Sequence, residues 1–333
     1  MKTAKKHVEL PMLAPLYCTY QYQGQATAVL SQNPSILNWY FNNIFILSCN
    51  RRFLNGFTSP EIDVVASDWH DCPYLEKVCY DTRFLDGCFD KIVKNILKDG
   101  YYVFFDGVDD YYVKGKSWYK ERHIKHDGML FGFDEDKKTY DIFSYDSDWV
   151  YRKYKTTQRS FYNGVTGLLK SGENSAFFAV KPMNDIIEFE PKTVMLKMKE
   201  YLDSTIERYP ENENGTVFGI AVHDYLVKYI EMLYDGSIPF WKMDRRVMRL
   251  IWEHKNVMLK RIRLLEEMLG LDCSIGDDYE KLVTEADRAR LLYASYHMRR
   301  RDPLLPMIRN GLIEIKNREE ELLNELIRKV GKI

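Results

Sequence analysis

The spacing of apolar residues changes near Pro182, and this change separates the chain into two regions of different fold class. Before Pro182, short runs rich in aromatic and β-branched residues alternate with polar turns, as is typical of strands. After Pro182, apolar residues recur three and four positions apart over long segments, as in amphipathic helices. We therefore predict an α+β domain over residues 1–182 and an all-helical domain over residues 183–333.

The first region combines the predicted strands with two segments of helical spacing. The strand-like runs are residues 100–113, 127–134, 139–146 and 175–182, and the helical segments are residues 24–48 and 88–100. Within the first run, Asp106-Gly107 predicts a turn between two strands. The polar residues 135–138 predict a second turn, which would join the next two runs as an antiparallel pair.

The second region contains five predicted helices, several of which end at a glycine. They are residues 191–209, 218–236, 242–270, 278–300 and 311–330. The most linker-like stretch, residues 209–216 (YPENENGT), lies between two of these helices and not between the domains. The charged last helix is amphipathic, so it is a candidate for packing within the domain or for a homodimer contact.

Charge, apolar runs and cysteine spacing argue against several classes of function. Lys plus Arg total 48 and Asp plus Glu total 49, whereas a dedicated nucleic-acid binder relies on a basic excess. No run approaches the roughly 18–20 apolar residues of a membrane span. The six cysteines form no CxxC pair, and no signal-peptide pattern follows the basic start of the chain. We therefore expect a cytoplasmic protein without disulfides, nucleic-acid partner or membrane anchor.

His126 is the first candidate for chemistry. It lies at the start of the predicted strand 127–134, where its ring can face a cleft. Asp146 ends the next predicted strand, and antiparallel strands joined by a short turn bring such ends together. Asp146 would then accept the imidazole N–H, or Asp148 would if the pairing slips by two residues. A histidine at a strand end is more often structural, so this interpretation depends on a nucleophile elsewhere.

Cys18 is the candidate nucleophile. It directly precedes the predicted helix that starts near Gly24, and the positive end of a helix dipole lowers the pKa of a thiol. Its backbone N–H can also donate to an oxyanion. The alternative is that Cys18 is a small buried apolar residue. Cys72 has His70 two residues away, but such close neighbours rarely reach catalytic geometry, and Cys49 is predicted to be structural at the end of a helix.

A metal site is not predicted. His123 and His126 form an HxxH pair, yet the segment reads as extended, where residues three apart point to opposite faces. The chain has neither an HExxH helix nor paired cysteines of the kinds that bind zinc.

The order of these residues, a cysteine before a helix, a histidine starting a strand and an aspartate on the next strand, is that of papain-like cysteine enzymes. Residues 100–148 resemble the core of the butirosin biosynthesis protein H, N-terminal acyltransferase family. The similarity lies in Asp109-Asp110-Tyr111, in the HxxHD sequence that ends at Asp127, and in the GFD strand that ends at Asp134. Phe218-Gly219, at the start of a helical region, also fits this family. The resemblance extends over residues 10–330.

The resemblance implies a papain-like domain with an antiparallel sheet, followed by an all-helical C-terminal domain. It implies an enzyme that takes an acyl group from the phosphopantetheine thioester of a carrier protein and forms an amide bond in nonribosomal natural-product biosynthesis. Acyl or peptidyl carrier proteins would be its partners, and it would need no cofactor of its own. Cys18 would be the nucleophile, His126 the base and Asp146 the residue that orients the imidazole.

Family members often use a glutamine upstream of the cysteine in the oxyanion hole, and none precedes Cys18 here. Gln21 or Gln23 would have to take that role, or backbone N–H groups alone would. Two alternatives stay open. One is a cysteine peptidase or thioester hydrolase with the same triad, and the other is a non-catalytic papain-like binding protein.

Overall fold

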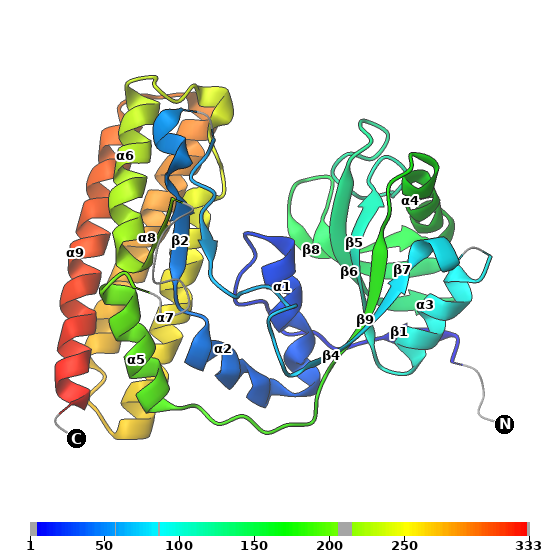
Figure 1. Cartoon of the computed structure of the whole chain (residues 1–333), viewed down its shortest axis with the longest axis horizontal. Coiled ribbons are helices and arrows are strands. Elements are labelled where there is room, and N and C mark those ends of the chain that lie inside the picture. Colours follow the sequence, from blue (N-terminus) through cyan, green and yellow to red (C-terminus); the bar gives the residue numbers. More distant parts are fainter. Residues whose placement is uncertain (1–4, 57, 86, 206–214, 332–333) are drawn as a thin grey trace. The chain divides into compact units, whose positions relative to one another are not determined.

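The chain divides into two units, and each unit is built from two separate stretches of sequence. The computed structural model describes residues 5–56, 58–85, 87–205 and 215–331 (Figure 1). The sheet-containing unit comprises Met1–Leu37 and Ser67–Ile186, and the helical unit comprises Asn38–Ala66 and Ile187–Ile333. The protein is therefore α+β, with antiparallel sheets and a helical C-terminal region. The observed division differs from the predicted boundary at residue 182 chiefly because Asn38–Ala66 belongs to the helical unit.

The main sheet of the first unit is antiparallel throughout. Its strand order is β4 (Leu75–Asp81), β9 (Ala176–Pro182), β5 (Tyr102–Asp109), β6 (Lys125–Asp134), β7 (Thr139–Tyr145) and β8 (Tyr151–Thr157), and β1 (His7–Glu9) also pairs with β6. The predicted pair around residues 135–138 is confirmed as the β6–β7 hairpin. The predicted strand at residues 175–182 is confirmed as β9.

The predicted turn at Asp106-Gly107 is wrong. β5 runs straight through these residues, and its register with β6 shifts between Phe105 and Val108. The Asp106 carboxylate accepts hydrogen bonds from the Ala176 N–H and the Ser175 hydroxyl of the neighbouring segment. An Asp-Gly pair therefore forms a bulge at this position, where the extra residue bends the strand without ending it.

Helices cover both faces of this sheet. On one face, α3 (Phe89–Lys98) and α4 (Gln158–Lys170) pack through Phe89 and Phe161 against the aromatic rings of β5 and β9. On the other face, α1 (Gln21–Ala28) packs against β6, and its Gly24 lies so close to Tyr151 that a Cβ would overlap the tyrosine ring. Trp69 packs against Phe104 on that second face. The central strands β5, β6 and β7 are therefore buried on both faces over most of their length.

The helical unit contains the long amphipathic helices and a small sheet. The helices are α2 (Leu37–Asn43), α5 (Pro191–Leu202), α6 (Val222–Tyr234), α7 (Val247–Leu269), α8 (Ser274–Arg299) and α9 (Leu304–Val330), and the small sheet has the order β10 (Thr216–Phe218), β2 (Leu47–Asn50), β3 (Asp63–Val64). All five predicted helices of the second region are present, with shifted ends. Most of the predicted linker 209–216 lies outside the described residues. In the described ranges, no helix combines the length and apolarity needed to cross a membrane.

Cys49 does not lie in a helix, contrary to the prediction. It lies in β2, opposite Val217 of β10, and is buried. Burial raises the pKa of its thiol to about 12, so Cys49 stays protonated and unreactive at neutral pH. This pairing between β2 and β10 joins the early stretch Asn38–Ala66 to the helical unit.

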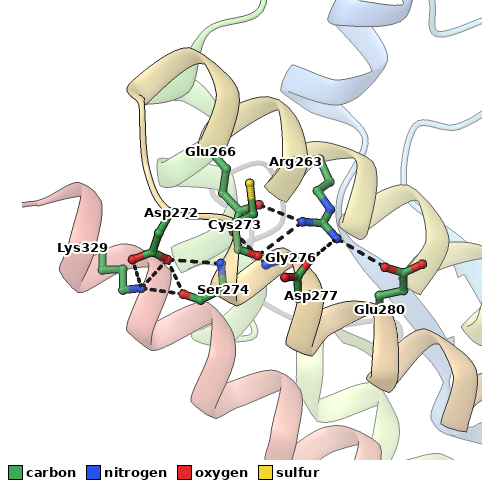
Figure 2. Close-up of polar contacts among 9 residues, drawn as sticks. All are labelled: Arg263, Glu266, Asp272, Cys273, Ser274, Gly276, Asp277, Glu280 and Lys329. Carbon is green, nitrogen blue, oxygen red and sulfur yellow. Dashed lines mark hydrogen bonds and ion pairs between the residues drawn. The ribbon is translucent and has the colours of Figure 1, made fainter.

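The turn between α7 and α8 is held by a dense set of polar contacts (Figure 2). The buried Glu266 carboxylate accepts a hydrogen bond from the Gly276 N–H at 2.7 Å, in the first turn of α8. Arg263 of α7 donates to Asp277 at 2.7 Å, and Lys329 of α9 contacts Asp272 at 3.1 Å. These contacts fix the start of α8 against both neighbouring helices.

Candidate functional site

His126 is held by a buried carboxylate at the end of the neighbouring strand. Its Nδ1 lies 2.6 Å from Oδ2 of Asp110, which follows directly on β5. Asp110 is 0% exposed and the His126 side chain is 34% exposed. An ionised carboxylate only accepts hydrogen bonds, so Nδ1 carries the proton and Nε2 is the ring nitrogen left to act as a base. The hydrogen bond to Asp110 therefore fixes the orientation of the imidazole.

Asp146 does not contact the imidazole, so the predicted third residue of the triad is corrected to Asp110. The Asp146 carboxylate accepts from the N–H groups of Asp148 and Val150 and pairs with Arg152. It therefore shapes the turn between β7 and β8. Asp148, the alternative partner, pairs with Arg152 at 2.6 Å. Asp110 takes the role because the β5 bulge carries the end of that strand alongside His126.

Lys116 is a second charged group at this site, and it is 1% exposed. Its Nζ lies 3.5 Å from Oδ1 of Asp110 and donates to the backbone carbonyl of Asp127 at 2.8 Å. The same ammonium lies 5.5 Å from the centroid of the Phe105 ring. Lys116 is thus the cation that accompanies the buried Asp110.

Cys18 lies three residues before the first residue of α1 and is half-buried. The hydroxyl of Tyr145, at the end of β7, donates to the Cys18 carbonyl at 2.8 Å. Gln21 reinforces the connection, because its Nε2 donates to Asp127 Oδ1 at 2.6 Å and its Oε1 accepts from the Tyr145 N–H at 3.0 Å. The start of α1 is therefore tied to the ends of β6 and β7.

The segment from Cys18 to Gln21 contacts the Asp127 side chain and not the ring of His126. His126 is paired with Val108, which packs beneath α4, whereas Asp127 reaches α1 on the opposite face. Successive residues of a strand point to opposite faces, so the two side chains diverge. The structure brings His126 to Asp110 and brings the Cys18 segment to Asp127, next to His126 in the chain.

Burial acts on the ionisation of the groups near Cys18. It raises the pKa of the Asp127 carboxyl above its usual range, while the positive charges of Lys116 and His126 act in the opposite direction. Burial also raises the pKa of the Tyr151 phenol well above its usual value, and the nearby Asp127 and Cys18 add to this effect. Removal from water is therefore the main influence on both Asp127 and Tyr151.

Neither glutamine proposed for the oxyanion hole points its amide into open space. Both hydrogen-bonding ends of Gln21 are engaged by Asp127 and Tyr145. The Gln23 amide donates to the Ser67 hydroxyl at 3.0 Å and is buried. Both side chains therefore help to fix α1.

The other cysteine–histidine pair considered from the sequence is not arranged for catalysis. Cys72 is fully buried, whereas the exposed His70 is hydrogen-bonded to Asp68 and stacks on Trp69. His123, the other member of HxxH, is hydrogen-bonded to Asp109 at 2.8 Å. Over the residues that the structure describes, no group of three or more His, Cys, Asp or Glu side chains is arranged to hold a metal ion.

Sequence reasoning missed Asp110 and Lys116. Asp110 lies in the segment that carries the family resemblance, but its role depends on the strand passing through Asp106-Gly107. Lys116 stands in an irregular loop where no periodicity predicts burial.

The sequence matches no family model, and a search of curated proteins finds no significant match.

Proposed function

We propose that this protein is a papain-like cysteine acyltransferase that forms an amide bond from a carrier-protein-bound thioester. Cys18 is the nucleophile, His126 the general base, and Asp110 the carboxylate that orients the imidazole. The observation that carries the proposal is the His126–Asp110 hydrogen bond, in which a fully buried carboxylate fixes a partly exposed imidazole. The place of Cys18 just before α1, a helix that packs against the His126 strand β6, is the second element of the proposal.

The chemistry is two successive acyl transfers. His126 Nε2 takes the Cys18 thiol proton, and the thiolate attacks the carbonyl carbon of the thioester. The bond from that carbon to the donor sulfur breaks, and the donor thiol receives the proton from the imidazolium. An amine then attacks the acyl-cysteine, its proton passes to His126, and a C–N bond forms as the C–S bond to Cys18 breaks. The cysteine recovers its proton and the cycle closes.

A second candidate is a non-catalytic papain-like binding protein. The observation in its favour is that the contacts of the Cys18 segment lead to Asp127 on the α1 face, away from the His126 ring. The Asp127 and His126 side chains point to opposite faces of β6, so catalysis requires the Cys18 segment to move toward the His126 ring. The two functions therefore differ in whether Cys18 and His126 act together.

Acylation of the thiol tests the proposal directly. We would incubate the protein with an acyl thioester of pantetheine and measure its intact mass, then add an amine and measure the amide and the free acid. Cys18→Ala should abolish the adduct, and His126→Ala should slow its formation by about 100-fold or more. Adduct formation that survives Cys18→Ala would refute the assignment of the nucleophile.

Cys88 provides the matched control. It is half-buried and also directly precedes a helix, α3, but it has no histidine–aspartate pair. Cys88→Ala should therefore leave adduct formation unchanged. Release of free acid alone in the presence of the amine would identify a hydrolase, and no adduct on any cysteine would favour the binding protein.

A further inference from the structure

The buried Asp110 carboxylate has two oxygens in different surroundings. Oδ2 takes the hydrogen bond from His126, while Oδ1 is buried and makes no hydrogen bond within the described part of the chain. The group opposite Oδ1 is the ammonium of Lys116, at 3.5 Å. Both side chains are removed from water. An uncompensated charge in such a buried place is strongly unfavourable.

This arrangement gives the site a definite charge balance. Without a cation beside it, a buried carboxylate is neutralised either by taking a proton itself or by keeping the neighbouring imidazole protonated. The first outcome removes the acceptor that orients Nδ1, and the second removes the base. Lys116 places a positive charge 3.5 Å from Oδ1 of Asp110, where it can compensate the carboxylate.

We propose that Lys116 is a positioning residue that sets the charge state of the His126–Asp110 pair and keeps the imidazole available as a base. This deepens the function proposed above, and only its catalytic consequence rests on that function. The ammonium also fixes β6 beside the pair, because it donates to the carbonyl of Asp127, the residue after His126.

The loop around Lys116 is built to hold this side chain in place. Gly115 has a φ of +97°, a conformation that favours glycine, and a Cβ there would press on the Tyr154 ring. The Lys116 backbone forms an isolated bridge with Asp146, and the Ser117 hydroxyl donates to the Asp146 carbonyl at 2.9 Å. The aspartate first assigned to the triad therefore supports the loop that presents Lys116.

Other titratable groups surround the pair, and each must stay constant in a test. Asp127 neighbours His126 on β6, and Asp68 lies within electrostatic range of Asp127. Tyr154 of β8 lies near Asp110, and burial keeps the pKa of its phenol far above neutrality. Cys18 and Asp127 both act electrostatically on the Tyr151 phenol. Lys116 also lowers the pKa of Asp127, so each Lys116 variant is compared with its parent in an Asp127→Asn background, where that carboxylate is absent.

The test is the nuclear magnetic resonance titration of the His126 imidazole, identified by the loss of its signal in His126→Ala. In Lys116→Met, the uncompensated Asp110 anion favours the imidazolium, so the titration midpoint should rise by about one pH unit or more. Lys116→Arg keeps the charge and should keep the midpoint near its original value. Lys91→Met, at an exposed lysine of α3, is the control for removing a distant positive charge.

A folded Lys116→Met protein with an unchanged His126 midpoint would overturn the proposal. If Lys116→Met does not fold, the double variant Asp110→Asn with Lys116→Met should fold, because it contains no uncompensated buried charge. Failure of both to fold would also overturn it. The titration is repeated in Cys18→Ala, so a wrong nucleophile and a wrong role for Lys116 give separable results.

Discussion

Substitutions of Asp110 and Asp146 should have different effects on acylation, because both residues are buried but only Asp110 contacts His126. Asp110→Asn removes the carboxylate that fixes the Nδ1 proton, and an asparagine amide can instead donate to that nitrogen and select the wrong tautomer. We expect the rate of Cys18 acylation to fall by about 100-fold or more. The measurement is the rate of adduct formation by intact mass.

Asp146→Asn is the paired variant. It keeps a side-chain oxygen for the N–H groups of Asp148 and Val150 and weakens only the contact with Arg152. Arg152 is half-exposed, and such ion pairs contribute little. Acylation should therefore stay within a few-fold of the original rate. An Asp146→Asn protein as impaired as Asp110→Asn would return the role to Asp146.

The candidate site shows how far single residues can be predicted. His126 is found from its place before an apolar strand, because that pattern is local. Asp110 cannot be found in the same way, since it becomes a partner only when β5 passes through Asp106-Gly107 and shifts its register. Short Asp-Gly sequences favour a turn, and here long-range hydrogen bonds from Ser175 and Ala176 to Asp106 override that preference.

The helices follow the sequence more closely than the strands do. α7, α8 and α9 each bury apolar residues at a spacing of three and four positions, which is a local pattern. β2 belongs to a run that reads as a helix end, and it becomes a strand by pairing with β10, which lies far away in the sequence. Pairing of this kind cannot be read from local periodicity.

The start of α8 provides a prediction about one helix. Glu266 accepts from the Gly276 N–H, one of the groups that a helix leaves without a partner in its first turn (Figure 2). Glu266→Ala leaves this buried N–H without an acceptor, so it should lower the free energy of unfolding by about 1–2 kcal/mol. The measurement is chemical denaturation followed by circular dichroism.

Glu267 is the control for this helix start. It is the next residue on α7 and is exposed, so Glu267→Ala should change the free energy of unfolding by less than about 0.5 kcal/mol. Equal losses in the two variants would mean that the hydrogen bond to Gly276 contributes nothing beyond the general cost of removing a glutamate from α7.

Among the described residues, each unit contains an ion pair in which both side chains are at most 1% exposed. In the sheet-containing unit it is Lys116 with Asp110, and in the helical unit it is Lys255 with Glu319, both fully buried at 2.5 Å. Tyr201 of α5 donates to the same glutamate at 2.8 Å and Tyr279 of α8 donates to its other oxygen, so these contacts join four helices. The sequence does not predict these pairs, because the two members of each pair lie on different elements and no local pattern links them.

The pair in the helical unit affects the histidines beside it. His223 and His254 are fully buried, and burial lowers the pKa of each well below its usual value, with the positive charge of Lys255 acting in the same direction. His254 Nε2 lies 2.7 Å from the Phe45 carbonyl, and His223 Nδ1 lies 3.0 Å from the Ile220 carbonyl. Both are therefore neutral in the folded unit at neutral pH.

This gives the helical unit a predictable response to acid. In the unfolded chain each histidine takes up a proton near its ordinary pKa of about 6.5, whereas the folded unit does not until the pH is much lower. The stabilisation is thus complete above about pH 6.5 and is lost as the pH falls below it. Each histidine should contribute a slope of about 1.4 kcal/mol per pH unit to the free energy of unfolding.

The double variant His223→Asn with His254→Gln isolates this effect, because the amides can still donate to the two carbonyls but do not titrate. Its free energy of unfolding is measured by denaturation between pH 7.5 and pH 5. The slope of this free energy against pH should be smaller than in the original protein by the contribution of two histidine protons. The slope is the informative quantity, since the substitutions also change the stability at any one pH. His7→Asn, at an exposed histidine of β1, should leave the slope unchanged. If the double variant kept the original slope, the acid sensitivity would come from other groups, such as His297, whose pKa is also lowered by burial, or from carboxylates, whose protonation lies at lower pH.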